Sequence, residues 1–401
     1  MSLSDLTGTT WDVVVVGSGP AGSATAITLA KYGQRVLLVE KRGSPGFKLG
    51  ESLPPASIGL VKHFLEDPDD PQLPGLFNTA GNVSLWTSEQ ADLADFFFTT
   101  SGRGLCIDRL AFDEALRANA VRAGATFLDG ASFRSCARIA DGPFNWQLTF
   151  VSEAGLRQDR ARYLVDCSGS QALVARTLGI ATVDNDDRLF AYAQWFSCAG
   201  DDDDRFTRIE AAPDGWWYSN RLPGAHDGET ARLVVFHSDK DLPAAKLAAS
   251  PHGFDQLLES SKHIAPLLKA RGYRPCGTIR GAPANSQRLE DFCGDAWIAV
   301  GDAAQAYDPL SSQGIDKALR TASHAGHMIH YALTDGPQDA AGLGPGNAFI
   351  RQYDEQQRQL WQNYMSQRDH YYGIQPRWSD QPFWQRRRLP GDEARLYSKG
   401  G

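Results

Sequence analysis

The first 40 residues of the chain place apolar runs on both sides of a glycine-rich turn. Residues 13–16 are four valines, a β-branched run typical of a parallel strand that is buried on both faces. The small and apolar residues after the turn predict a helix that ends at Gly33, and "RVLLVE" predicts a second strand that ends at Glu40. This order of elements predicts a Rossmann-type α/β domain.

A different pattern occupies residues 187–282. Apolar and polar positions alternate in "LFAYAQWFS", "GWWYSNRLP" and "ARLVVFHSD", which predicts an antiparallel sheet, and residues 254–270 have helical periodicity. Because side chains alternate between the two faces of a strand, either Trp216 and Tyr218 or Trp217 would line a cavity on this sheet. Packing inside the fold is the ordinary alternative for strand aromatics. The candidates for a substrate wall are Trp86, Trp216, Trp217 and Tyr218.

The turn "GSGPAG" has the GxGxxG spacing of a dinucleotide site. Gly17 permits the tight turn, Gly19 lets the backbone approach a pyrophosphate, and Gly22 lets the helix lie close to the strand. Glu40, about 20 residues farther on, is placed for ribose hydroxyls, which suits FAD or NAD and disfavours a 2′-phosphate. The residues expected to contact the dinucleotide here are Gly17, Gly19, Pro20, Ala21, Gly22, Glu40 and Lys41.

Composition narrows the classes of partner. The chain has 401 residues, with 40 Lys and Arg against 48 Asp and Glu, so we expect no binding surface for nucleic acid or anionic lipid. Its six cysteines show no CxxC pair and no ligand spacing, which argues against disulfides and against a metal site. Neither a leader-like N-terminus nor an apolar run of about 18 residues occurs, and we therefore expect a cytoplasmic protein without a membrane partner.

Two distant segments distinguish between FAD and NAD. "RYLVDCSGS" predicts a strand before a Ser168-Gly169 turn, and "WIAVGDAAQAYDPLSSQGIDKAL" predicts a strand, a Gly-Asp turn, a loop and a helix from about Gly314. With the first motif, these segments resemble the FAD-dependent monooxygenases of the aromatic-hydroxylase type.

This resemblance implies FAD as the cofactor and a place for each motif. Asp302 would contact the ribityl or pyrophosphate part of FAD, and the loop 309–315 would lie along the isoalloxazine, where the dipole of the next helix favours negative charge. "RLAFDEAL" also matches the family and implies that Arg109 lies near the flavin or its phosphates. The other cofactor-binding residues implied are Ser52, Gly301, Pro309, Ser312, Gln313, Gly314 and Ile315.

The segment "GESLPP" resembles one branch of this superfamily, which holds flavin-dependent halogenases, geranylgeranyl reductases and flavoproteins that mature tryptophan-derived quinones. Halogenases carry a catalytic lysine, a WxWxIP motif and a glutamate in the flavin loop. In this chain no lysine occurs between Lys62 and Lys240, the motif reads "GWWYSNRLP", and Ser311 stands in the place of the glutamate. The chain therefore resembles halogenases in its flavin-binding motifs but lacks the residues that carry out halogenation in that family.

Over nearly its whole length the chain resembles the maturation flavoproteins for cysteine tryptophylquinone, which serve lysine ε-oxidase, glycine oxidase and quinohemoprotein amine dehydrogenase. The phrases "DGWWYSNRLP", "DPLSSQGIDKAL" and "HYYGIQPRWSDQPFWQRR" carry this resemblance. It implies hydroxylation of a tryptophan in a partner protein or peptide through a flavin C4a-hydroperoxide, with O2 as co-substrate. NAD(P)H would reduce the FAD directly, or a separate flavin reductase would. Backbone amides of Gln313 and Gly314 are the candidates at the reactive flavin edge, and no catalytic acid or base is assigned.

Other functions remain open at this point. They are hydroxylation or halogenation of a small indole or other aromatic natural product, reduction of an isoprenoid, and a non-catalytic role as an FAD-binding maturation chaperone. Halide incorporation, anaerobic substrate reduction or the absence of any oxygenated flavin would distinguish them.

The predicted organisation is an FAD-binding domain with an antiparallel substrate domain inserted and a C-terminal helical segment. Its first part is 1–186, of which 50–105 contributes partly to the substrate side, and the substrate lobe is 187–282. The second FAD-binding part is 283–355, and the helical and aromatic tail is 356–401. The four aspartates 201–204 are expected in a solvated loop. The arginines 386–388 are expected to pack the tail onto the FAD lobe or to cap the substrate entrance.

Overall fold

The computed structural model describes residues 9–41, 48–65, 76–96, 102–140, 142–184, 186–226, 229–335 and 342–388. The first large sheet has eight strands and a parallel centre, in which β1 pairs with β2 and β11, and β11 pairs with β20. The valine run is the centre of this sheet, and it is buried as predicted. The strands are β1 (Thr10–Val16), β2 (Val36–Val39), β8 (Thr126–Leu128), β9 (Ser132–Arg138), β10 (Trp146–Ser152), β11 (Gly155–Asp166), β19 (Cys293–Gly294) and β20 (Trp297–Ala299).

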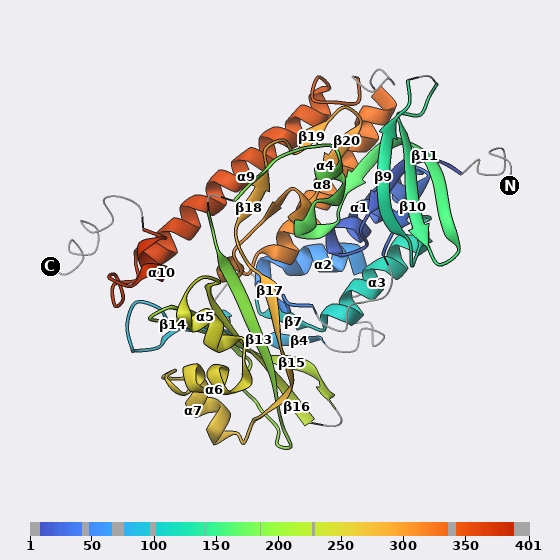
Figure 1. Cartoon of the computed structure of the whole chain (residues 1–401). Coiled ribbons are helices and arrows are strands. Elements are labelled where there is room, and N and C mark those ends of the chain that lie inside the picture. The colour runs from blue at the N-terminus through green and yellow to red at the C-terminus, as the bar shows by residue number, and fades with distance from the viewer. Residues whose placement is uncertain are drawn as a thin grey trace.

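Helices α1 (Pro20–Lys31) and α8 (Gly314–Asp335) lie side by side against this sheet (Figure 1). Small residues allow the close approach, since a Cβ at Gly326 of α8 would lie 2.6 Å from Cγ2 of Thr28 in α1. Helix α3 (Arg109–Arg122) packs on α1. The long helix α9 (Ala348–Gly373) leads away from this lobe toward α10 (Pro382–Gln385), as Figure 1 shows in orange and red.

The second large sheet has seven strands in the order β17-β13-β16-β15-β14-β5-β6. The predicted antiparallel pairing is confirmed, because β16 pairs antiparallel with both β13 and β15. Two of its strands, β5 and β6, come from a segment that precedes the rest of the sheet in the chain. The strands are β5 (Gly81–Leu85), β6 (Asp92–Asp95), β13 (Leu189–Cys198), β14 (Phe206–Ala212), β15 (Gly215–His226), β16 (Glu229–Asp239) and β17 (Arg274–Pro283).

One face of the second sheet is covered by helices α5 (Pro243–Ala248), α6 (Pro251–Glu259) and α7 (Ile264–Ala270) (Figure 1). The prediction of a single helix over 254–270 is wrong, because α6 ends at Glu259 and α7 begins only at Ile264. The carboxylate of Glu210 accepts the amides of Lys262 and His263 at this break. A buried acceptor on the neighbouring sheet thus satisfies the amides that begin a new helix.

The prediction that the aspartates 201–204 lie in a solvated loop is wrong for two of the four. Asp202 and Asp204 are buried, and both carboxylates lie within 3 Å of Nη2 of Arg232, whose side chain is fully buried in β16. A buried guanidinium requires such partners, so the acidic run supplies them from the neighbouring loop.

Shorter elements connect the two sheets, and the predicted domain boundaries remain a prediction. None of the helices in the described ranges is long and apolar enough to cross a membrane. The remaining elements are β3 (Ser52–Leu53), η2 (Pro55–Ser57), α2 (Ile58–Leu65), β4 (Leu76–Thr79), β7 (Gly104–Ile107), η4 (Gly169–Gln171), α4 (Leu173–Thr177), β12 (Thr182–Val183), β18 (Gln287–Leu289), η5 (Gly301–Ala303), β21 (Gln305–Ala306) and η6 (Pro309–Ser311).

Candidate functional site

A cavity of about 520 Å³ is lined by residues from both large sheets. The glycine turn before α1, the residues after β2 and β11, and the N-terminus of α8 form its first side. The inner face of the second sheet forms the opposite side. Of the residues predicted to bind FAD, all except Gly22, Gly301 and Gln313 line this cavity. Their contacts with the cofactor remain a prediction.

Gly22 and Gly301 have packing roles outside the cavity lining. A Cβ at Gly22 would lie 1.8 Å from the carbonyl oxygen of Gly17, and one at Gly301 would lie 2.7 Å from Cβ of Ala21. Gln313 is also outside the lining, and its side chain donates to Oε1 of Gln367 in α9 at 3.3 Å. The adjacent Gly314 lines the cavity and begins α8, so of the two flavin-edge candidates only Gly314 faces this space.

Gly19 differs from the other motif glycines in a way that fits a bound dinucleotide. A Cβ at Gly19 would meet no atom within 4 Å, and its φ of −68° is open to any residue. Protein packing therefore gives no reason for glycine at this position. It lines the cavity at the N-terminus of α1, where backbone amides and the helix dipole favour a phosphate group. The residues fit FAD, whose pyrophosphate needs this space.

Polar side chains around the turn are already held in place. Oε2 of Glu40 accepts from the amide and the hydroxyl of Ser18 at 2.8 and 2.9 Å. Nζ of Lys317, which is buried in α8, lies 2.7 Å from Oδ1 of Asp302. The guanidinium of Arg109 donates to the carbonyl oxygen of Leu49. Fixed carboxylates and a fixed arginine can orient ribose and phosphate groups with little reorganisation.

The wall on the second sheet follows from the register of its strands. Ala191, Trp216 and His237 are cross-strand neighbours, so they share a face. The next row on that face holds Tyr218 and Val235. The residues of this wall that line the cavity are Ala191, Trp216, Tyr218, Leu233, Val235, His237 and Ala282.

The register of the strands decides which aromatic residues of β15 face the cavity, a choice that the sequence left open. Trp216 and Tyr218 line the cavity. Trp217 does not, because it faces α6: its ring lies 5.2 Å from that of Phe254 in α6 and 4.6 Å from that of Phe236 in β16. The interpretation of Trp217 as a substrate wall is therefore wrong.

Trp86 also lies outside the cavity lining. Its indole Nε1 donates to the carbonyl oxygen of Tyr371 at 2.6 Å, and its ring contacts those of Trp216, Tyr372 and Trp384. It supports Trp216 from behind, which is a packing role.

His237 is a cavity residue that the sequence did not single out. Its ring stacks on Trp216 at 3.7 Å, and it is only 3% exposed. Burial lowers the pKa of His237 to about 3, so the imidazole is neutral near pH 7. Its Nδ1 has no hydrogen-bond partner among the described residues. A neutral imidazole here can hydrogen-bond a substrate, and the strand alternation of "VVFHSD" was the available signal.

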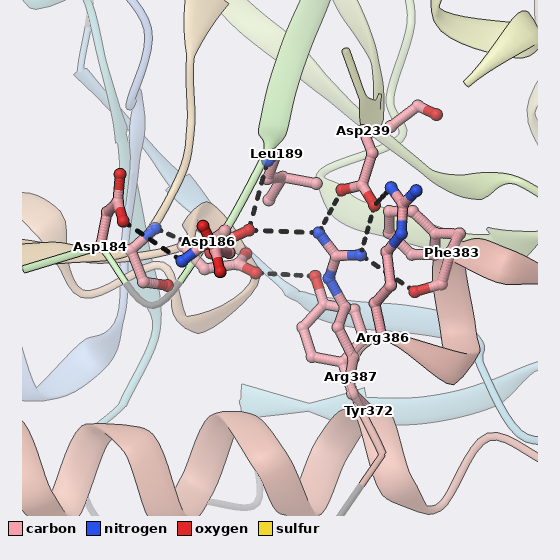
Figure 2. Close-up of polar contacts among 12 residues, drawn as sticks. Asp184, Asp186, Leu189, Asp239, Tyr372, Phe383, Arg386 and Arg387 are labelled. Atoms are coloured by element: carbon pink, nitrogen blue, oxygen red, sulfur yellow. Dashed lines mark hydrogen bonds and ion pairs between the residues drawn. The ribbon is translucent and has the colours of Figure 1, made fainter. Parts of the chain in front are cut away.

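The C-terminal segment packs behind this wall. Tyr372 of α9 accepts from Nε1 of Trp216 at 3.0 Å and donates to Oδ2 of Asp308 at 2.7 Å, which connects the wall with the loop before α8. Figure 2 shows Arg387 between Asp239 of β16 and the carbonyl oxygen of Phe383. The tail therefore packs at the junction of the two lobes, and neither its packing on the FAD lobe alone nor its capping of an entrance describes it.

Cys167 is a cysteine that lines the cavity. All six cysteines are free. Over the described ranges, no group of three or more His, Cys, Asp or Glu side chains is placed to hold a metal ion.

Known proteins share this architecture. On the myxobacterial chondrochloren halogenase CndH the chain superposes with a TM-score of 0.80 and 22% identity, covering 96% of this chain and 88% of CndH. On the peptidyl tryptophan dihydroxylase QhpG, essential for tryptophylquinone cofactor biogenesis, the TM-score is 0.68 at 22% identity, covering 94% of this chain and 78% of QhpG. These likenesses confirm the predicted mixed α/β FAD-binding fold.

Sequence relatives give the family. The chain is 30% identical over 381 residues to the FAD-dependent oxidoreductase LodB of Marinomonas mediterranea, a match that covers 94% of this chain and 96% of LodB. The profile of the family described as FAD dependent oxidoreductase matches residues 12–237, more than half of the chain. The protein is therefore a member of the FAD-dependent oxidoreductase family.

Proposed function

We propose that this protein is an FAD-dependent monooxygenase that hydroxylates a tryptophan side chain of a partner protein during biogenesis of a cysteine tryptophylquinone-type cofactor. The observation that carries the proposal is the cavity wall of small and aromatic side chains opposite the dinucleotide motif. Alanines at 191 and 282 leave space for a planar ring, and Trp216 and Tyr218 border it. The likeness to the peptidyl tryptophan dihydroxylase QhpG supports this substrate class, and the near-complete match to LodB supports FAD-dependent redox chemistry.

Each lobe contributes a separate task. The N-terminus of α1 and Glu40 would hold the pyrophosphate and ribose of FAD, and the N-terminus of α8 would face the flavin. When bound, FAD supplies the activation of O2 with electrons from NAD(P)H or from a reductase. The apolar wall orients the substrate ring and excludes water from it. The stacked pair Trp216 and His237 gives the wall a rigid end.

Halogenation of a small aromatic compound is the second candidate, because the higher TM-score belongs to CndH. The lysines of the cavity argue against it. Lys41 and Lys48 lie on the dinucleotide side, and Nζ of Lys48 is 2.6 Å from Oδ2 of Asp113. No lysine lies on the described face of the second sheet, where a substrate ring would pack.

The experiment is intact-mass measurement of candidate tryptophan-containing partner proteins after incubation with the holoprotein, a reductant and O2. Hydroxylation predicts a gain of one or two oxygen atoms that requires the flavoprotein. The same reaction with chloride or bromide tests halogenation. Halogen incorporation, or peroxide release without any oxygen gain across the candidate partners, would reject the proposed reaction.

A further inference from the structure

Two polar side chains meet where the first segment of the cavity lining contacts the second sheet. Glu51 follows Gly50, whose φ of +97° makes the turn before β3, and its side chain is directed into the fold, so that the residue is only 4% exposed. Tyr218 lies on the cavity face of β15. Both residues line the cavity. Its lining therefore includes a buried carboxyl group beside a phenol.

The hydrogen bonds indicate which group donates and which accepts. The hydroxyl of Tyr218 donates to Oε1 of Glu51 at 2.5 Å, and the amide of Gly50 donates to Oε2 at 3.1 Å. Both oxygens of Glu51 therefore accept hydrogen bonds, as those of a carboxylate do. Burial raises the pKa of Tyr218 well above its ordinary value, so the phenol remains a donor. The pair is a carboxyl group whose two oxygens accept hydrogen bonds, one of them from a neutral phenol.

Two carboxylates of the lining lie in salt-bridge range of a lysine, whereas Glu51 has no cation in that range among the described residues. Asp302 is paired with Lys317, and Asp113 with Lys48. Within the described ranges no Lys, Arg or His lies in salt-bridge range of Glu51. Burial raises the pKa of Glu51, while the hydrogen bonds from Tyr218 and the backbone and the charge of Arg109 oppose this. A buried carboxyl group without a salt bridge is costly for folding when it is ionised, which favours a functional role.

We propose that Glu51 is the proton acceptor of the site and that Tyr218 is its positioning partner. This inference rests on the proposed function. When a ring carbon gains a hydroxyl group, a C–O bond forms as the O–O bond of the reduced oxygen breaks, and the C–H bond at that carbon then breaks. The C–H electron pair returns to the ring, and Glu51 takes the proton. The second oxygen atom leaves as water, formed with two electrons from the reductant and two protons, so the proton on Glu51 returns to the pool that this water draws on.

The groups that face Glu51 define its expected titration. They are Tyr218 of β15, Arg109 of α3 and Cys106 of β7. Burial raises the pKa of the Cys106 thiol well above its ordinary value, and its Sγ donates to the carbonyl oxygen of Arg221, so it adds no charge near neutral pH. Removal of the phenol takes away a hydrogen bond that favours the ionised carboxylate, and Tyr218→Phe should therefore raise the pH at which Glu51 titrates.

The first test needs no substrate. The flavin absorption spectrum of the holoprotein is recorded against pH for wild type, Glu51→Gln and Tyr218→Phe. We expect one transition in wild type, the same transition at higher pH in Tyr218→Phe, and none in Glu51→Gln. Equal FAD content and melting temperature show that the variants are folded. A transition that persists unchanged in both variants, or the absence of a transition from wild type, would refute the proposed roles of Glu51 and Tyr218.

The second test uses 3-methylindole as a probe, with a reductant and O2, and measures oxygenated probe per O2 consumed. We expect Glu51→Gln to lower this ratio at least about 100-fold while O2 consumption continues as peroxide release. Tyr218→Phe should retain product and shift its pH profile upward. Equal product from wild type and Glu51→Gln would refute the acceptor role and leave monooxygenation standing. A spectral transition with no oxygenated probe in wild type would instead refute aromatic oxygenation, and with it the ring as the proton source.

Discussion

Replacement of Gly19 by alanine should weaken FAD binding while leaving the fold intact. The new methyl group would meet no protein atom within 4 Å, and the backbone conformation at φ −68° and ψ −172° suits alanine. Loss of glycine flexibility in the unfolded chain stabilises by about 0.4–1 kcal/mol. Alanine is a poorer N-cap than glycine by about 1 kcal/mol or less, which offsets this gain. The free energy of unfolding of the apoprotein should therefore change by less than about 1 kcal/mol.

The effect on FAD should be much larger than the effect on folding. The methyl group would occupy the space at the N-terminus of α1 where the pyrophosphate is expected. Forcing an extra methyl group into a close-packed contact costs about 1–3 kcal/mol. This corresponds to roughly 5- to 150-fold weaker binding. Gly19→Ala apoprotein should also gain less thermal stabilisation than wild type from the same FAD concentration, because the stabilisation by a ligand grows with the logarithm of its concentration relative to Kd.

The assay is titration of apoprotein with FAD, followed by quenching of flavin fluorescence, together with melting curves at several FAD concentrations. Gly22→Ala provides the matched contrast, because its Cβ would lie 1.8 Å from the carbonyl oxygen of Gly17 and should destabilise the fold even without FAD. If Gly19→Ala bound FAD as tightly as wild type, the backbone at Gly19 would not be the point of close approach. If Gly19→Ala lowered the melting temperature of the apoprotein as much as Gly22→Ala does, the inference that a methyl group at position 19 meets no protein atom would be wrong.

Three further outcomes are expected. Arg387→Met should lower the free energy of unfolding by roughly 3 kcal/mol in urea denaturation, because it leaves the buried carboxylates of Asp187 and Asp239 with fewer partners. Burial alone would raise the pKa of Asp187, yet the charges of Arg368 and Arg387 hold it below its usual value. The ionised carboxylate therefore stabilises the fold fully above about pH 4, and this stabilisation is lost as the pH falls through the lowered pKa. Arg387→Met should weaken this pH dependence of the free energy of unfolding. Burial lowers the pKa of His237 from 6.5 to about 3, so wild type should lose about 2 kcal/mol of stability between pH 7 and pH 5 that His237→Phe does not lose; equal pH dependence in both proteins would refute this.

Local sequence predicts the dinucleotide half of the site because the motif and its packing are local. The strand, the turn and α1 are consecutive in the chain, so the spacing of Gly17, Gly19 and Gly22 already fixes which backbone is crowded and which is open. The position of Glu40 follows from one further strand. A Cβ at Gly22 would lie 1.8 Å from the carbonyl oxygen of Gly17, whereas one at Gly19 would meet no atom within 4 Å.

Contacts between distant segments were not predicted. Arg232 and the aspartates 202 and 204 are about 30 residues apart, and an acidic run carries no sign of a buried arginine elsewhere. Glu51 likewise reads as part of a turn motif, because its partner Tyr218 is 167 residues away. Buried charge is decided by which segments meet, and composition or periodicity cannot supply that information.

The choice between the two faces of β15 shows where the missing information lies. The cavity face carries small residues, Ala191 and Ala193, while the face toward the helices carries Tyr192 and Phe236 beside Trp217. The difference in side-chain size is present in "LFAYAQWFS", and a cavity needs the smaller face because large side chains would fill it. Assigning Trp216 to that face also requires the register between β15, β16 and β13, since a shift of one residue exchanges the faces. Size and register together place Trp216 and Tyr218 at the cavity, and register is set by the assembled sheet.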